Sequence, residues 1–275
     1  MRIVILGSSV YSETACAMAV RLAQMEQVPV GALALSTLNR GTLLRKLRQW
    51  GAREVANYAR AKLMPQQRDQ SPKLHNTYLQ PLLNPKGDLF RSLREVAGLY
   101  SFPVAICDDQ NSPNAIAQLR KWSPDLIIFT GGNILRQTVL AVPRLGVLNV
   151  HLGLLPEIRG MNSPEWSLLK NVPVGITVHY IDAGIDTGPI LQRYEFPDTV
   201  ARESLSDLRN RLIAFGVEKV GDVVAALDHG SISPIPQSDL NEDRQFFVMH
   251  EWLRARAAER LARSRKPSLA GTLNE

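Results

Sequence analysis

The chain has 275 residues, 45% of them hydrophobic, and a formal net charge of +6. This length and composition indicate a globular protein with one large domain, or one domain and a small appendage. The first apolar run, RIVIL, breaks at Gly7 and is too short for a signal sequence or a membrane span. We therefore expect a cytoplasmic protein.

Cysteine usage and charge narrow the class of protein further. Cys16 and Cys107 lack metal-ligand spacing, so we expect no metal site and no disulfide framework. The positive charge gathers in residues 40–73 and 254–266. Such runs are typical of solvated helix faces, and these lack the interleaved aromatic residues of a base-stacking platform. We do not expect nucleic acid to be the partner.

Apolar runs of strand length alternate with helical periods along the chain. The predicted strands and helices of the first half are strand 2–7, helix 13–27, strand 28–36, a basic helix pair over 41–64, a loop over 65–88, helix 88–98, strand 102–109, a helix opened by Ser112 and Pro113, and strand 125–132. This alternation predicts an α/β fold with a doubly wound, mostly parallel sheet. Helices are expected over 202–227 and 242–264.

Polar residues follow three apolar strands, where the ligand crevice of such a sheet lies. Gly131 and Gly132 end one strand, and Asn149 and His151 share a face at the end of the next. Taken singly, each polar residue also has a structural interpretation, as a buried hydrogen-bonding group or a turn residue. The third strand is followed by a turn-rich loop with two carboxylates, whereas the histidine within that strand is expected to be structural; these residues are Asp182, Asp186 and His179.

The series Asn149-Val150-His151, Leu154-Leu155-Pro156, Arg159-Gly160 and Asp186-Thr187-Gly188-Pro189 resembles the formyltransferases that use 10-formyltetrahydrofolate. That family includes glycinamide ribonucleotide, methionyl-tRNA and sugar-nucleotide formyltransferases. The resemblance extends from about Pro103 to Leu191, is general over residues 1–36 and is absent over 40–100. It implies a Rossmann-like formyltransferase fold, with a helical insertion at about 40–100 and a helical C-terminal extension.

The resemblance implies three catalytic residues. Asn149 and a protonated His151 would stabilise the oxyanion that develops as an amine attacks the formyl carbon. Asp186 would order a water or carry the proton to the departing folate nitrogen. One departure is that Leu152-Gly153 stand where the family usually has Pro-Ser or Ala-Ser. The missing hydroxyl puts the acceptor contacts in doubt more than the core chemistry.

The resemblance also implies where the two substrates bind. The pterin of 10-formyltetrahydrofolate would lie in an apolar slot between two loops. The slot residues are Gly131, Gly132, Asn133, Ile134, Leu135, Ile181 and Asp182. The acceptor is expected against the turn after the first strand, where backbone N–H groups favour an anion, and against the motif arginine. These acceptor-binding residues are Gly7, Ser8, Ser9 and Arg159.

We expect residues 1–200 to form the catalytic domain and 201–275 the helical extension. Methionyl-tRNA formyltransferase carries a further β-barrel that the helical 201–275 cannot supply, and glycinamide ribonucleotide formyltransferase lacks the basic insertion. A small-molecule amine is therefore the expected acceptor, such as a nucleotide-linked amino sugar or a siderophore or amino-acid amine. The sequence leaves the oligomeric state open, a homodimer included.

Two alternatives remain. The first is a formyltetrahydrofolate hydrolase, which would share the catalytic residues; members of that class carry an N-terminal regulatory domain, whereas here the first strand begins at Arg2. The second is a non-catalytic α/β module that binds anions, nucleic acid or a membrane through the basic helices. Its affinity for nucleic acid would fall steeply with salt and would not depend on His151.

Overall fold

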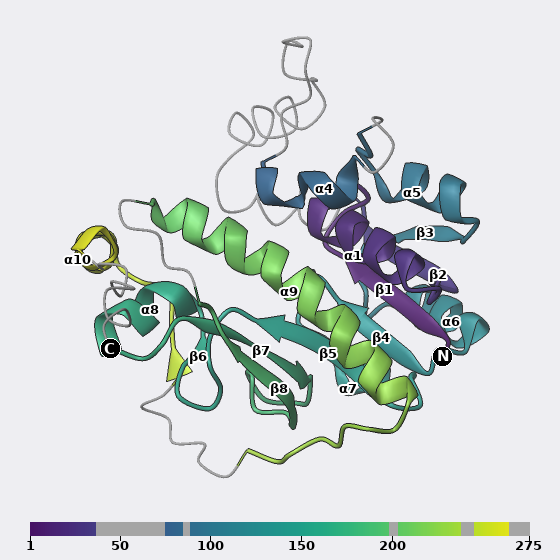
Figure 1. Ribbon diagram of the computed structural model, residues 1–275. Coiled ribbons are helices and arrows are strands. Elements are labelled where there is room, and N and C mark those ends of the chain that lie inside the picture. The colour runs from purple at the N-terminus through teal and green to yellow at the C-terminus, as the bar shows by residue number, and fades with distance from the viewer. Residues whose placement is uncertain (37–74, 85–88, 198–202, 238–244, 264–275) are drawn as a thin grey trace, which may run out of the picture. The chain divides into compact units, whose positions relative to one another are not determined.

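The computed structural model describes residues 1–36, 75–84, 89–197, 203–237 and 245–263 (Figure 1). These residues form two compact units, Met1–Asn149 and Val150–Glu275. The predicted basic helix pair over 41–64 and the basic run 40–73 lie outside the described residues.

The first unit is built on parallel strands in the order β3-β2-β1-β4-β5. They are β1 (Ile3–Gly7), β2 (Gly31–Leu35), β3 (Val104–Cys107), β4 (Leu126–Phe129) and β5 (Gly146–His151), whose last two residues belong to the second unit. All five residues of β1 are buried, as expected for the central strand of a sheet covered on both faces. The chain leaves β1 toward β2 on one side and reaches β4 on the other, so the topological switch point lies between β1 and β4.

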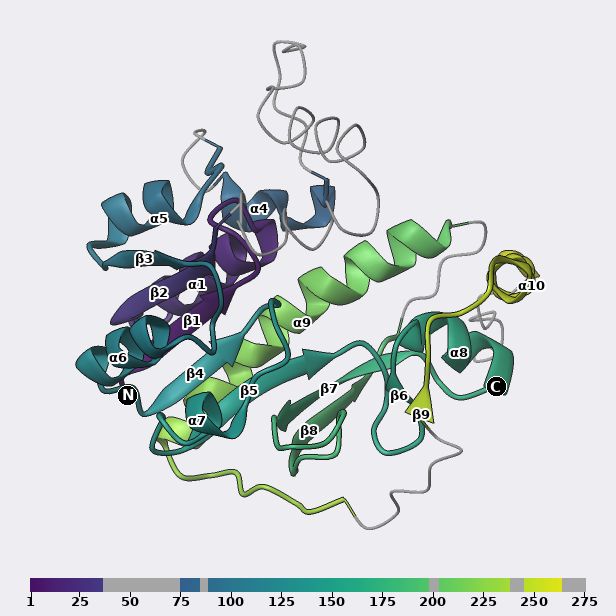
Figure 2. The same ribbon diagram turned by 180° about the vertical axis from the view of Figure 1, so that it is seen from behind.

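The helices of this unit cover both faces of its strands, with α1 and α5 on one face and α6 on the other (Figures 1 and 2). They are α1 (Glu13–Gln24), η1 (Thr77–Leu79), α4 (Gln80–Leu83), α5 (Leu93–Tyr100), α6 (Pro113–Trp122) and α7 (Gln137–Leu140). Ser12, Ser92 and Ser112 cap α1, α5 and α6 by accepting a backbone N–H from the first turn. The Ser112-Pro113 start signal is confirmed.

The second unit combines short strand pairs with long helices. Its elements are β6 (Arg159–Gly160), α8 (Ser163–Lys170), β7 (Gly175–Tyr180), β8 (Ile190–Glu195), α9 (Leu205–Asp228), β9 (Gln245–Phe246) and α10 (Glu251–Arg263). β7 and β8 are antiparallel, and β6 pairs with β9 in parallel. The core joins β7 to α9 and α10 through Ile176, Leu208, Leu212 and Leu261.

Two predictions of local structure were wrong. The predicted loop 65–88 contains η1 and α4, because Asn76 caps the turn and Leu79 and Leu83 are fully buried. The predicted helix 242–264 begins only at Glu251. Ahead of it lies β9, since Phe246 pairs with β6 and its ring stacks on Trp166 at 4.6 Å.

Among the described helices, none has the length and apolar content needed to cross a bilayer. Within the same residues, no group of His, Cys, Asp and Glu side chains is arranged to hold a metal ion. Both cysteines are free thiols. Burial raises the pKa of Cys16 to about 12 and that of Cys107 to about 11, so neither favours the reactive thiolate.

Replacing either of two helical glycines by alanine should change the free energy of unfolding in opposite directions. A Cβ at Gly216 of α9 would lie 2.7 Å from Val150 Cγ1, whereas a Cβ at Gly98 of α5 meets nothing within 4 Å. Gly216→Ala should therefore lower the free energy of unfolding by about 1–3 kcal/mol through overpacking. Gly98→Ala is the matched control and should raise it by about 0.5–1 kcal/mol, because alanine has the higher helix propensity. Urea denaturation measures both, and equal effects of the two variants would contradict this packing of α9.

Candidate active site

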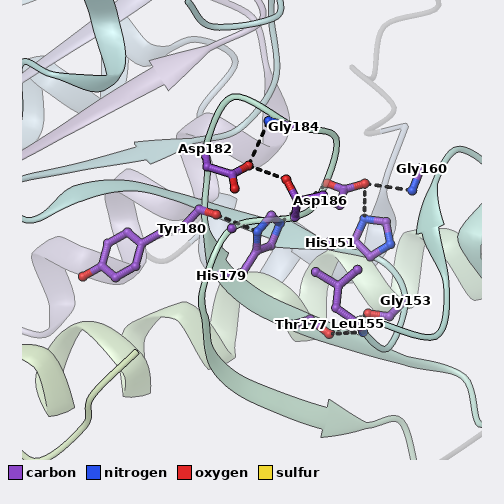
Figure 3. A network of polar contacts seen from close by, with 12 residues as sticks. His151, Gly153, Leu155, Gly160, Thr177, His179, Tyr180, Asp182, Gly184 and Asp186 are labelled. Atoms are coloured by element: carbon purple, nitrogen blue, oxygen red, sulfur yellow. Dashed lines mark hydrogen bonds and ion pairs between the residues drawn. The ribbon is translucent and has the colours of Figure 1, made fainter. Parts of the chain in front are cut away.

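The carboxylate of Asp186 is the centre of a buried polar network in the second unit (Figure 3). Its Oδ2 accepts the Gly160 backbone N–H at 2.9 Å and lies 3.2 Å from His151 Nδ1. Its Oδ1 lies 3.6 Å from His179 Nε2. Asp186 has a φ of 53°, in the left-handed region that aspartate tolerates better than most residues. Three segments of the unit therefore meet at one carboxylate.

His151 is held on both sides of its ring. Nδ1 faces Asp186, and Nε2 lies 2.8 Å from the carbonyl oxygen of Ile158. Both partners are acceptors, so both contacts are hydrogen bonds only when the ring carries two protons. The two contacts thus fix the orientation of the His151 ring. Both ring nitrogens of His151 therefore have protein partners in this conformation.

His179 is the second histidine beside Asp186, and it is fully buried in β7. Its Nδ1 lies 2.8 Å from the carbonyl oxygen of Tyr180, which assigns the proton to Nδ1 in the neutral ring. Burial and the nearby His151 lower the pKa of His179 to about 4, against the opposing effect of Asp186. His179 is therefore neutral near pH 7.

Side chains from neighbouring segments fix the loops of this network. Thr177 Oγ1 donates to the Gly153 carbonyl at 2.7 Å and accepts the Leu155 N–H at 3.0 Å, which ties the loop after β5 to β7. The Leu155-Pro156 peptide bond in that loop is cis. Gln237 Nε2 donates to the carbonyl oxygens of Asp186 and Gly188 at 3.0 and 2.7 Å. The backbone on both sides of Thr187 is thereby held in place.

The other predicted residues of this unit lie around the network. Ile181 and Asp182 follow β7 directly, and Asp182 Oδ1 accepts the N–H of Gly184 at 3.0 Å and the hydroxyl of Thr187 at 2.6 Å. The Asp182 carboxylate therefore shapes its own loop. Arg159 is buried in β6, with 3% of its surface exposed.

The packing around Gly153 gives a reason for Leu152-Gly153, which stand where the family usually has Pro-Ser or Ala-Ser. A Cβ at Gly153 would lie 2.9 Å from Ser163 Cβ and 3.0 Å from His151 Nε2. Ser163, whose hydroxyl donates to the Gly160 carbonyl at 3.0 Å, thus fills the space that a side chain at position 153 would need. Glycine at 153 fits the packing around His151.

The remaining predicted residues lie in the first unit, at the carboxyl ends of its strands. Asn149 lies on β5 two residues before His151, so both side chains project from one face of the strand. Gly7, Ser8 and Ser9 follow β1, while Gly131 through Leu135 follow β4. These two loops flank the switch point, and a Cβ at Gly131 would lie 3.4 Å from Ser8 Cβ. Leu135 is buried, whereas Ile134 is 88% exposed.

Sequence reasoning missed three contributors to the network. His179 was expected to be structural, Gln237 was not singled out, and the Gly160 N–H is a backbone group. The alternation of β7 placed His179 on one face of the strand, but only the structure shows that Asp186 lies beside it. Gln237 lies 51 residues from Asp186 and gave none.

Part of the chain is similar to known formyltransferases. Residues 95–224 match the formyl transferase family. Methionyl-tRNA formyltransferase of Geobacter metallireducens is 33% identical over 152 residues, which cover 54% of this chain and 48% of that protein. The same enzyme of Koribacter versatilis is 36% identical over 156 residues, covering 55% and 49%. The chain spans about half the length of the curated relatives it matches.

Solved structures share the fold at lower identity. Glycinamide ribonucleotide transformylase 1 from Symbiobacterium toebii has a TM-score of 0.53 at 19% identity, with 89% of this chain and 92% of that chain covered. Phosphoribosylglycinamide formyltransferase from Anaplasma phagocytophilum has a TM-score of 0.54 at 18% identity, with 90% and 98% covered. The α/β fold of this chain is therefore that of formyltransferase structures.

The depressed pKa of His179 predicts a pH-dependent stability. Between its ordinary pKa of 6.5 and about 4, the unfolded state binds a proton that the folded state does not. The contribution of His179 is thus present above pH 6.5 and lost as the pH falls toward 4. We expect the free energy of unfolding of His179→Asn to fall less between pH 7 and pH 4.5 than that of the wild type.

Urea denaturation at the two pH values measures this difference. His229→Asn, at the exposed end of α9, is the control and should keep the wild-type dependence. An unchanged dependence in His179→Asn would show that His179 is not held neutral by its surroundings.

Proposed function

We propose that the chain, whose residues 95–224 match the formyl transferase family, transfers a formyl group from 10-formyltetrahydrofolate to the amine of a small-molecule acceptor. 10-Formyltetrahydrofolate is the donor used in that family. The observation that carries the proposal is the pairing of Asp186 with His151 at the end of β5, two residues after Asn149. A half-buried carboxylate paired with a buried imidazole can move a proton and stabilise charge, as acyl transfer to an amine requires.

The reaction forms a carbon–nitrogen bond to the acceptor and breaks the bond between the formyl carbon and N10 of the folate. Negative charge develops on the formyl oxygen, and Asn149 would donate its amide N–H to it. His151 would place a positive charge near that oxygen. Direct donation by His151 requires Nε2 to exchange the Ile158 carbonyl for the formyl oxygen. The burial of the ring, 6% exposed, strengthens its electrostatic effect.

One proton must move from the attacking amine to N10. Asp186 is the group that accepts it, directly or through a water, and returns it to the departing nitrogen. Its Oδ2 already accepts two donors, whereas Oδ1 faces His179, whose Nε2 carries no proton in the neutral ring. Oδ1 is therefore the oxygen that takes the proton. His179 can accept a hydrogen bond from that oxygen once it is protonated.

We assign the two substrates to the loops predicted from the sequence. The donor would use the loop after β4 and the residues after β7, namely Gly131, Gly132, Asn133, Ile134, Leu135, Ile181 and Asp182. The acceptor would use Gly7, Ser8, Ser9 and Arg159. The exposure of Ile134 supports the first assignment, because an apolar side chain on an ordered loop suits the face of a flat heterocycle. Residues 1–200 would form the catalytic part and 201–275 its extension.

The basic residues of α10 favour a small acceptor over a nucleic acid. Arg260 donates to the carbonyl oxygens of Leu168 and Leu169 and to Asn171 Oδ1 at 2.8–2.9 Å, so it caps the end of α8. Arg256 lies 5.3 Å over the Trp252 ring and 3.9 Å from Glu259. Both cations have structural partners. A nucleotide-linked amino sugar or an amino-acid or hydroxylamine-type amine is the acceptor that we propose.

A tRNA acceptor is the second candidate, because relatives at 33% and 36% identity are named methionyl-tRNA formyltransferases. A panel that contains amino-sugar nucleotides, amino-acid amines and initiator methionyl-tRNA separates the two, with product formylation detected by mass spectrometry. Formylation of methionyl-tRNA alone would contradict the small-molecule proposal. Tetrahydrofolate release that needs no acceptor would indicate a hydrolase.

The role of Asp186 predicts a loss of turnover without a loss of fold. Asp186→Asn keeps an oxygen that can accept the Gly160 N–H, but it removes the proton acceptor. We expect kcat to fall by about 100- to 10000-fold, the range of general acid–base catalysis. Absorbance at the wavelength of tetrahydrofolate release gives kcat, and circular dichroism checks the fold. Glu218→Gln, whose side chain is 62% exposed on α9, is the control and should keep wild-type kcat. Turnover of Asp186→Asn within tenfold of the wild type would remove Asp186 from the mechanism.

A further inference from the structure

The loop after β4 has no regular hydrogen-bonded structure of its own, yet its backbone is held at four points by two side chains that follow β3. Gln110 Oε1 accepts the Asn133 N–H at 3.0 Å, and Gln110 Nε2 donates to the Gly131 carbonyl at 3.4 Å. Asn111 Nδ2 donates to the Ile134 carbonyl at 3.0 Å, and its Oδ1 accepts the Arg136 N–H at 2.7 Å. We call Gln110 and Asn111 the clasp.

Gln110 also reaches across the switch point. Its Nε2 lies 3.3 Å from the Gly7 carbonyl oxygen at the end of β1, and the side chain is fully buried. All three partners of the amide agree with one orientation of its oxygen and nitrogen. A glutamate has the same shape but no N–H to offer Gly7 and Gly131. The contacts therefore require an amide at position 110.

The absence of a side chain at Gly132 leaves the space that Gln110 occupies. Its φ is 148°, and a Cβ there would lie 2.1 Å from Gln110 Oε1. Any side chain at position 132 would displace the buried amide. Gly132, which the sequence assigned to the folate slot, thus also leaves room for Gln110 to pass over the loop.

One apolar side chain of this loop, that of Ile134, is exposed to solvent. Leu135 packs into the core of the unit, whereas Ile134, the residue between two clasp contacts, is 88% exposed. An exposed apolar side chain on an otherwise tied loop is costly to present to water and is typical of a binding surface.

We propose that Gln110 and Asn111 are positioning residues for the formyl donor: they hold residues 131–136 in the conformation that presents Ile134 to the folate. This inference rests on the proposed function. Loss of a clasp contact lets the loop leave that conformation, and the apparent affinity for the folate falls by the fraction of time that the loop spends elsewhere. Chemistry at Asn149, His151 and Asp186 is unaffected once the folate is bound.

The test uses the full chain with Gln110→Glu, Asn111→Ala and Ile134→Ala, and Gln80→Glu at the exposed start of α4 as the matched control. Hydrogen exchange of the Asn133 and Arg136 amides in the free protein reports the loop, and calorimetry with tetrahydrofolate reports affinity. Asn111→Ala removes the acceptor of the Arg136 N–H, whereas Gln110→Glu keeps an oxygen for the Asn133 N–H but loses the donor contacts to the Gly7 and Gly131 carbonyls. Because the loop is then less restrained, we expect about tenfold faster exchange of the Arg136 amide in the first variant and of the Asn133 amide in the second. Binding should weaken about tenfold in both, with kcat at saturating donor within twofold of the wild type. If Gln110→Glu does not fold, Asn111→Ala still tests the inference, because Asn111 is only half-buried.

Ile134→Ala should weaken tetrahydrofolate binding and leave exchange unchanged, since it alters the presented side chain and none of the clasp contacts. Unchanged exchange in the clasp variants, or faster exchange with unchanged affinity, would overturn the inference. Absence of tetrahydrofolate binding by the wild type would instead overturn the proposed function, and the inference with it, so the two failures are distinguished in the wild-type measurement.

Discussion

The second unit is organised around one half-buried carboxylate, which contacts a backbone N–H and two histidines at once. Asp186 accepts the Gly160 N–H and pairs with His151, and its other oxygen faces His179. Burial and the nearby His151 lower the pKa of His179 to about 4, so His179 stays neutral beside the carboxylate. The left-handed backbone conformation of Asp186 and the hydrogen bond from Gln237 hold the carboxylate toward its partners.

In the first unit, neutral amide side chains rather than a carboxylate hold the loops in place. Two loops flank the switch point of its strands, and neither belongs to a helix or strand. Gln110 joins them through amide hydrogen bonds, and Asn111 holds the rest of the second loop. In both units several of the residues proposed to touch substrates lie on loops, and side chains remote in sequence give those loops a defined shape. Catalytic groups need such support because a displacement of about 1 Å can cost a large factor in rate.

Much of this could be predicted from the sequence, and the failures have physical reasons. The alternation of apolar strands with capped helices was enough for the α/β fold, and the Asn149, His151 and Asp186 motif located the network. Local patterns did not reveal η1 and α4, whose few buried leucines lie among loop-forming residues. They also could not reveal the contacts of Gln237 or Gln110, since hydrogen bonds across 51 and 103 residues leave no periodic trace.

The most direct test of the account measures tetrahydrofolate release from 10-formyltetrahydrofolate by the wild type and His151→Ala, first with no acceptor and then with pooled amines. The account predicts release by the wild type that depends on the amines and is lost in His151→Ala, because the imidazolium held by Asp186 stabilises the developing oxyanion. Amine-dependent release at the same rate in both proteins would contradict it.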